Sequence, residues 1–166
     1  MADLTEEQAN KYFTYDEEVG KLLWKVAKGR ARVGHVAGYI DRRGYRVVKI
    51  DGKLYKIHRL VFLINKGYLP KVLDHINNDR ADNRIENLRP ANLYQNSQNS
   101  KLRFDNTSGI KGVSLHKVTK KWEAKVQAYG KRKYLGQFHT LEEAEQIVTT
   151  VRKDLHGQFT NHGGTV

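Results

Sequence analysis

One polar segment in the middle of the chain, residues 72–89, sets the strongest limit on its fold and chemistry. Two apolar residues lead into Asp74 and His75, and Asn and Asp then dominate the residues up to 87. A carboxylate can hold a divalent cation while the imidazole beside it accepts a proton from water, and hydrolysis of a phosphate diester requires both tasks. Asn and Asp side chains also commonly satisfy backbone groups in tight loops, which is the alternative reading of the polar residues.

The charge of the chain indicates an anionic partner. Its 166 residues contain 30 Lys and Arg against 18 Asp and Glu, for a net charge of +12 and a pI of about 9.8. The first 20 residues carry six acids and one base, so the remainder carries about +17. A basic surface of this size is typical of nucleic-acid binding.

The absence of cysteine and of long apolar segments indicates in which compartment the protein works. Without cysteine the chain has neither disulfides nor thiolate zinc sites, which fits a reducing compartment. The sequence has no secretory signal and no apolar stretch long enough to span a membrane. We therefore expect an intracellular protein with no membrane partner, built as one ordinary domain or two small ones.

Periodicity in the first hundred residues predicts short strands followed by a helix. Residues 13–57 contain β-rich runs separated by glycines, and Asp51-Gly52 between two such runs is a strong hairpin signal. Residues 58–64 have a helix-compatible apolar pattern that ends before Pro70. We expect Val72-Leu73 to form a strand and residues 91–99 to form a helix.

The last third of the chain predicts a small sheet covered by one helix. Apolar and polar residues alternate through 113–127, and a further strand is expected at 133–138. Thr140 and Glu143 form a capping box at the start of an amphipathic helix. The helix should cover the apolar face, leaving a polar and basic face that could enter a major groove. That face carries Ser114, His116, Glu123, Lys125, Gln127, Arg132 and Tyr134.

Several short motifs around the polar segment stand at fixed offsets from one another. They are His58-Arg59-Leu60-Val61, Asp74-His75, Asn77-Asn78-Asp79, Asp82-Asn83-Arg84, Glu86-Asn87-Leu88-Arg89 and Asn96. This set resembles the HNH endonuclease family, in the phage and intron homing branch where Asn replaces the last His. The resemblance covers about residues 13–100. Asn78 stands where many relatives have Gly, and Asn also tolerates a left-handed turn.

The resemblance implies a role for each matching residue. Asp74 would be a metal ligand and His75 the general base, while Asn87 would hold the loop and orient the imidazole. Asn96 would supply the second protein oxygen, with Asn99 as a competing candidate one helical turn away. An oxygen-only ligand pair favours Mg²⁺ or Mn²⁺, with one ion per active site and no small-molecule cofactor. His58 is interpreted as a structural or substrate-adjacent residue.

Motifs in the last third resemble a second family. They are Gly109-Ile110-Lys111-Gly112-Val113, Lys121-Trp122-Glu123-Ala124-Lys125-Val126, Tyr134-Leu135-Gly136-Gln137-Phe138 and Glu143-Ala144. They resemble the DNA-binding domain of plant ethylene-response factors, whose DNA-contacting positions fall on the polar face identified above. Lys120 and Lys121 would add phosphate contacts. Four face positions (Ser114, Lys125, Gln127 and Tyr134) differ from the family's usual Arg or Trp, so the plant target sequence does not carry over.

The combined expectation is an α+β protein of two small modules. A ββα-metal nuclease module with a β-rich N-terminal region would occupy residues 1–100, with its core at 57–100. A linker at 101–107 would lead to a three-stranded antiparallel sheet packed on one helix at 108–160, and a tail at 161–166.

The expected function is metal-dependent cleavage of double-stranded DNA by a monomer or weak dimer, in the cytoplasm of a bacterial or phage-infected cell. The alternative is a sequence-specific DNA-binding regulator with an inactive nuclease module. RNA cleavage is a third possibility, which the sheet-face reader disfavours.

Overall fold

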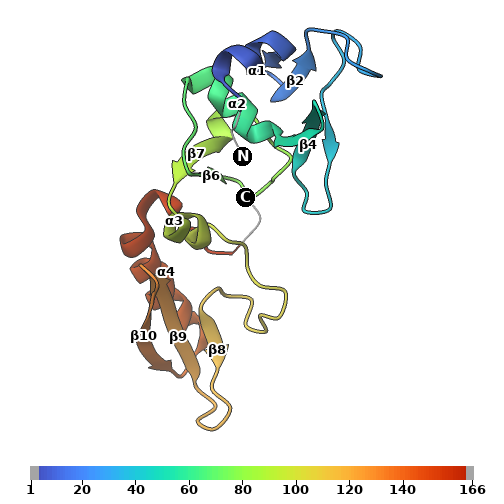
Figure 1. Ribbon diagram of the computed structural model, residues 1–166. Coiled ribbons are helices and arrows are strands. Elements are labelled where there is room, and N and C mark those ends of the chain that lie inside the picture. Colours follow the sequence, from blue (N-terminus) through green and yellow to red (C-terminus); the bar gives the residue numbers. More distant parts are fainter. Residues whose placement is uncertain (1–3, 164–166) are drawn as a thin grey trace. The chain divides into compact units, whose positions relative to one another are not determined.

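The computed structural model describes residues 4–163 of the chain. Contacts divide the chain into two compact units, Met1–Pro90 and Ala91–Val166, drawn in blue to green and in yellow to red in Figure 1. Each unit has its own hydrophobic core. Among the described residues, none of the helices combines the length and apolar character needed to cross a bilayer.

The first unit consists of short strands and helices that form small sheets. Its elements are α1 (Glu6–Tyr12), β1 (Phe13–Asp16), β2 (Lys21–Trp24), β3 (Tyr39–Ile40), β4 (Arg46–Ile50), β5 (Lys53–Lys56), α2 (Ile57–Lys66), β6 (Val72–His75), the 3₁₀ turn η1 (Ile85–Asn87) and β7 (Leu88–Ala91). The strands pair as β1-β2, β3-β4-β5 and β6-β7. The pairing of β1 with β2 and the pairs within the three-stranded sheet are antiparallel.

The core of the first unit lies between α2 and the strands that precede it. Ile57 and Val61 of α2 are completely buried, in the same cluster as Phe13, Trp24 and Val48. The predicted helix after residue 57 and the predicted hairpin at Asp51-Gly52 are both confirmed. Both turn residues have positive φ, 48° and 80°, as a tight two-residue hairpin turn requires. This core fixes the element that leads into β6.

Two elements of the first hundred residues were not expected from the sequence, whereas the helix expected at residues 91–99 is present. Residues 6–12 form α1, whose capping box of Thr5 and Gln8 was not recognised in the sequence. The segment before the expected helix forms β7, and the helix itself, α3 (Leu93–Gln98), lies in the second unit by its contacts. The expected module boundary near residue 100 therefore lies beyond the division at Pro90.

The second unit is a three-stranded antiparallel sheet with one long helix on it. After α3 it contains β8 (Val113–Leu115), β9 (Trp122–Ala128), β10 (Lys131–Phe138), α4 (Leu141–His156) and the 3₁₀ turn η2 (Gly157–Phe159). The strand order is β10-β9-β8, and α4 runs along one face of this sheet (Figure 1).

The core of the second unit follows from the alternation in its strands. Val113, Ala124 and Val126 of the sheet pack against Ala144 and Val148 of α4. The predicted capping box is present at the start of α4, where the Thr140 hydroxyl accepts a hydrogen bond from the Glu143 amide. The expected sheet with one covering helix is confirmed, and its opposite face stays open for a partner.

Candidate active site

Asp74 and His75 lie together at the end of β6 in the first unit. Both are buried, with exposed fractions of 5% and 6%. β6 pairs with β7, and just beyond β6 the Ile76 amide donates to the Asn87 carbonyl at 2.9 Å. The two strands therefore fix the backbone on which the carboxylate and the imidazole stand.

Asn83 determines how the imidazole of His75 is oriented. Its side-chain oxygen lies 3.4 Å from Nε2 of His75, and its exposed fraction is 1%. The amide nitrogen of Asn83 donates to the Ala81 carbonyl, so the amide oxygen faces the ring. In the tautomer with its hydrogen on Nε2, the imidazole would donate to this oxygen.

The surroundings of His75 also favour its neutral form. Burial lowers the pKa of His75 below 6.5, while the Asn83 hydrogen bond and the charges of Asp74, Asp79 and Asp82 act in the opposite direction. Because the net direction is downward, the imidazole is uncharged at neutral pH. An uncharged imidazole is the form that can act as a general base.

The carboxylate of Asp74 is held by an arginine that the sequence analysis did not assign. Nε and Nη2 of Arg89 each lie 2.8 Å from Oδ2 of Asp74. Asp74 is on β6 and Arg89 on β7, so strand pairing brings the two together. Cross-strand pairing of opposite charges is the signal that could have identified this partner.

Asn87 closes the polar loop between β6 and β7. Its side-chain oxygen accepts from the Asn77 amide at 3.0 Å, and its nitrogen donates to the Asp82 carbonyl at 2.8 Å. Asn87 thus holds the loop through its amide, and the imidazole of His75 lies 3.4 Å from the side-chain oxygen of Asn83. Asn78 has φ of +59°, the left-handed conformation expected there.

Tyr15 supports the same loop from outside. Its hydroxyl accepts from the Ile85 amide at 2.9 Å and lies 3.5 Å from the Asn83 carbonyl. Tyr15 is on β1, far from the loop in sequence, and no short motif connects them. This supporting residue could be found only from the folded structure.

His58 packs edge-on against the ring of His75. The ring centroids are 4.9 Å apart, and the ring of Tyr45 lies 5.3 Å from that of His58. The pKa of His58 is lowered to about 3, mainly by burial and further by the charges of His75, Lys56 and Arg59. His58 is therefore neutral, and its place beside His75 agrees with the structural or substrate-adjacent role expected for it.

The two candidate ligands on the helix side differ in their surroundings. Asn96 lies on α3 and is exposed, whereas Asn99 is buried and its side-chain oxygen accepts from Asn161 at 3.3 Å. Both belong to the second unit, while Asp74 belongs to the first. Across residues 4–163, no group of three or more His, Asp or Glu is placed to hold a metal ion.

The predicted polar face of the sheet is present in the second unit. Strand register pairs Ser114 with Glu123, Lys125 with Tyr134 and Gln127 with Arg132, so each pair shares one face. Lys125 is ion-paired with Glu123 at 2.8 Å.

Other predicted positions lie near the turn between β8 and β9. His116 accepts from the Thr119 amide through Nδ1, and Lys120 adopts a positive φ of 58°. Lys121 is half-buried beside them.

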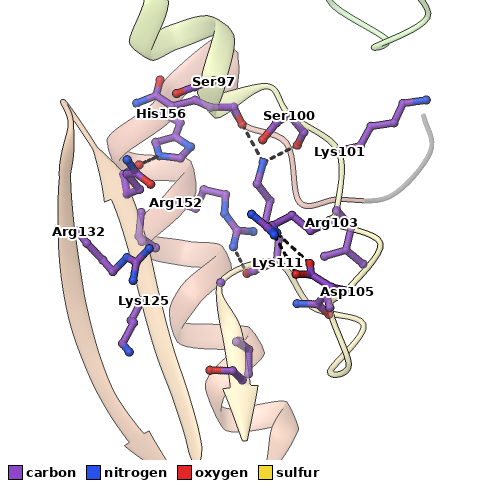
Figure 2. A pocket seen from close by; sticks show the side chains of 18 of the residues that line it. Ser97, Ser100, Lys101, Arg103, Asp105, Lys111, Lys125, Arg132, Arg152 and His156 are labelled. Carbon is purple, nitrogen blue, oxygen red and sulfur yellow. Dashed lines mark hydrogen bonds and ion pairs between the residues drawn. The ribbon is translucent and has the colours of Figure 1, made fainter. Parts of the chain in front are cut away.

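A basic cleft of about 620 Å³ continues this face (Figure 2). Its cationic lining comes from the sheet, from α4 and from residues 101–111, and comprises Lys101, Arg103, Lys111, Lys125, Arg132 and Arg152. Asp105 is the carboxylate among the lining residues, and it is paired with Arg103 at 2.8 Å. The cleft therefore offers a net positive surface to an anion.

The expected linker at 101–107 forms one wall of this cleft. Lys111 anchors that wall by donating from Nζ to the carbonyls of Gln98, Ser100 and Asn161, and its own carbonyl accepts from Arg152. Burial lowers the pKa of Lys111 to about 8. The three carbonyl acceptors favour the charged ammonium at neutral pH, so this lysine fixes the wall. Arg103 and Lys125 are ion-paired, and Arg132 is exposed.

Comparisons with known proteins agree with the residues assembled above. Residues 55–98 match the family model described as HNH endonuclease. The chain is similar to protein 3.8 of Escherichia phage T7, with 40% identity over 96 residues that cover 58% of this chain and 76% of that protein.

It is also similar to a protein of Acanthamoeba polyphaga mimivirus named uncharacterized HNH endonuclease L560, with 29% identity covering 93% of this chain and 86% of that protein. No solved structure matches the chain. The region matched by the family model contains the buried pair Asp74-His75 and the loop closed by Asn87. The chain therefore contains a domain of the HNH endonuclease family at residues 55–98.

Proposed function

We propose that this protein is a metal-dependent endonuclease that hydrolyses phosphodiester bonds in double-stranded DNA, with His75 as the general base. The observation that carries this proposal is the buried imidazole of His75, held neutral beside Asp74 and faced at Nε2 by Asn83. A neutral imidazole fixed in this way can take a proton from an attacking water.

Asp74 and Asn96 are the residues that would hold the metal. A carboxylate oxygen and an amide oxygen are hard donors, which suit Mg²⁺ or Mn²⁺. Arg89 is bound to Oδ2 of Asp74, and a carboxylate has lone pairs enough to serve a second cation. A bound cation would stabilise the charge that develops on the phosphate during cleavage. Asn99 is engaged with Asn161, which favours Asn96 as the ligand.

The polar loop acts by positioning. Asn87 connects the two sides of the loop through the Asn77 amide and the Asp82 carbonyl, and Asn83 is the member that reaches the imidazole. Loss of either asparagine should therefore reduce the rate through misplacement of His75.

The second unit would hold the DNA in the manner of an ethylene-response-factor-like domain. Its uncovered sheet face presents Gln127, Arg132 and Tyr134, and the adjoining cleft is lined mainly by cations. Side chains on a sheet face can reach base edges in a major groove, while lysines around it contact phosphates.

Incubation of the whole protein with supercoiled and with linear DNA tests the function. We expect nicked or linear product with Mg²⁺ or Mn²⁺ and none with a chelator, and restored cleavage when the metal is added back. The alternative, a DNA-binding regulator, is favoured by the basic cleft alone and predicts tight binding without cleavage under every metal condition.

A further inference from the structure

The aromatic ring of Tyr45, in the first unit, has two cations over it. Nζ of Lys56 lies 4.2 Å from the ring centroid, and the guanidinium carbon of Arg80 lies 5.0 Å from it. The cation–π attraction holds each side chain in place. The three residues come from different parts of the sequence, before β4, at the end of β5 and in the polar loop after β6.

The same ring also reaches the histidines of the candidate active site. Its centroid lies 6.1 Å from the ring of His75 and 5.3 Å from that of His58. Tyr45 therefore contacts the imidazole on which the proposed chemistry depends as well as the two cations. A ligand bound by those cations would lie beside His75, the proposed general base.

The two cations have no carboxylate to neutralise them. Neither Lys56 nor Arg80 forms an ion pair with any residue in the described range 4–163. Partial burial lowers the pKa of Lys56, Asp41 acts against this, and the charges of Arg43, Arg59 and Arg80 lower it further. Cations gathered in this way repel one another, and a bound anion would relieve the repulsion.

The arginine is also preorganised. Nη1 of Arg80 donates to the Arg43 carbonyl at 2.9 Å, which fixes the guanidinium and leaves other N–H groups for a ligand. The backbone turn that carries Arg43 is also fixed, because Oδ1 of Asp41 accepts hydrogen bonds from the amides of Arg43 and Tyr45. A donor held rigidly before binding loses little entropy when the ligand arrives.

We propose that Lys56 and Arg80, held over the ring of Tyr45, form a phosphate-binding site for the DNA strand beside the bond whose hydrolysis His75 would assist as general base. Guanidinium and ammonium groups together recognise the oxygens of a phosphodiester, the first through paired donors and the second as a point charge. This inference rests on the proposed endonuclease function and assigns it a binding site in the first unit, separate from the sheet face of the second.

Binding without cleavage tests the proposal in the full-length protein. In a His75→Ala background with chelator, affinity for a short DNA duplex is measured at several salt concentrations for Lys56→Gln and Arg80→Gln. Lys53→Gln is the matched control, because Lys53 is exposed on the same strand as Lys56 and its substitution removes the same charge. Each test variant should reduce the slope of log K against log salt by about 0.9, and the control should leave the slope unchanged.

Two further pairs separate the phosphate site from a general effect of folding. Lys56→Arg should restore the slope that Lys56→Gln loses, because it restores the charge. Tyr45→Phe keeps the ring and should bind as the parent does, whereas Tyr45→Leu removes it and should weaken binding. Equal slopes for Lys56→Gln, Arg80→Gln and Lys53→Gln would overturn the inference. Absence of cleavage by the wild-type protein would instead overturn the proposed function, while the binding slopes could still be measured.

Discussion

At the scale of single residues, the chemistry depends on an imidazole whose charge and direction are set by its neighbours. Burial keeps His75 neutral, and the amide oxygen of Asn83 faces one of its nitrogens. Three nearby carboxylates, of Asp74, Asp79 and Asp82, limit how far the pKa falls. The lowered pKa favours the neutral imidazole, which is the form that the proposed general base requires.

The pH dependence of cleavage tests this environment. A general base must be unprotonated, so the rate should fall at acidic pH with a midpoint below 6.5, because the pKa of His75 is lowered. Asn83→Asp places a carboxylate beside the ring and should raise that midpoint by about one pH unit or more. Asn83→Ala, the matched control, removes the hydrogen bond without adding charge. Single-turnover rates across pH give both midpoints, and an acid limb for Asn83→Asp that is unmoved or lower would contradict the account.

At the scale of elements, a helix start or a turn could be predicted where its signal lies within a few neighbouring residues of the sequence. The hairpin at Asp51-Gly52 and the start of α4 at Thr140 follow from turn and cap chemistry within a few residues, and both were predictable. The strand expected at Val72-Leu73 is also present, and it continues through Asp74 and His75 as β6.

The missed features depend on contacts between distant residues. Arg89 reaches Asp74 only because β6 pairs with β7, and Tyr15 reaches the loop from β1. Residues 101–107 have no apolar period, so they resembled a linker. They form a wall because Lys111 binds the carbonyls of Gln98, Ser100 and Asn161. Neither hydrophobic periodicity nor a short motif could have predicted these contacts.

The sheet of the second unit yields a prediction about how DNA is held. Arg132 is exposed on the polar face opposite Gln127, whereas Lys121 lies beyond that face near the turn. Arg132→Ala should cost on the order of 1 to 3 kcal/mol on the preferred site and much less on random DNA. Lys121→Ala should weaken both similarly and reduce the salt slope by about one.

Affinities of the two variants for specific and random duplexes separate the roles. Lys125 is a less clear probe than Arg132, because its ammonium is already paired with Glu123. Equal losses for Arg132→Ala on both duplexes would show that the face contacts only the DNA backbone, and site choice would then have to come from the first unit.

At the scale of the whole molecule, the chain joins two cores that share no residues. The first is built around Phe13, Leu22 and Ile57, and the second around Val113, Ala124 and Val148. After residue 20 the chain carries a net charge of about +17. This positive charge attracts a polyanion such as DNA. Because the cores are separate, DNA binding by the second unit can be tested apart from the first.

A fragment of residues 91–166 tests that division. It retains its own core, together with α3 and the carbonyls that Lys111 requires, so it should fold. It should bind DNA at low salt and should not cleave it, because Asp74 and His75 are absent. Circular dichroism and DNA titration give both results. A folded fragment that fails to bind DNA at low salt would limit the resemblance to ethylene-response factors to the fold.

The most direct test of the central claim is the cleavage rate of His75→Ala compared with wild type on the same DNA, with Mg²⁺, alongside the affinity of each protein for that DNA. Loss of a general base should lower the rate by about 10²-fold or more, while affinity should stay nearly unchanged because the substitution removes no cation that binds DNA. A His75→Ala protein that cleaves at the wild-type rate would remove His75 from the chemistry and contradict the account.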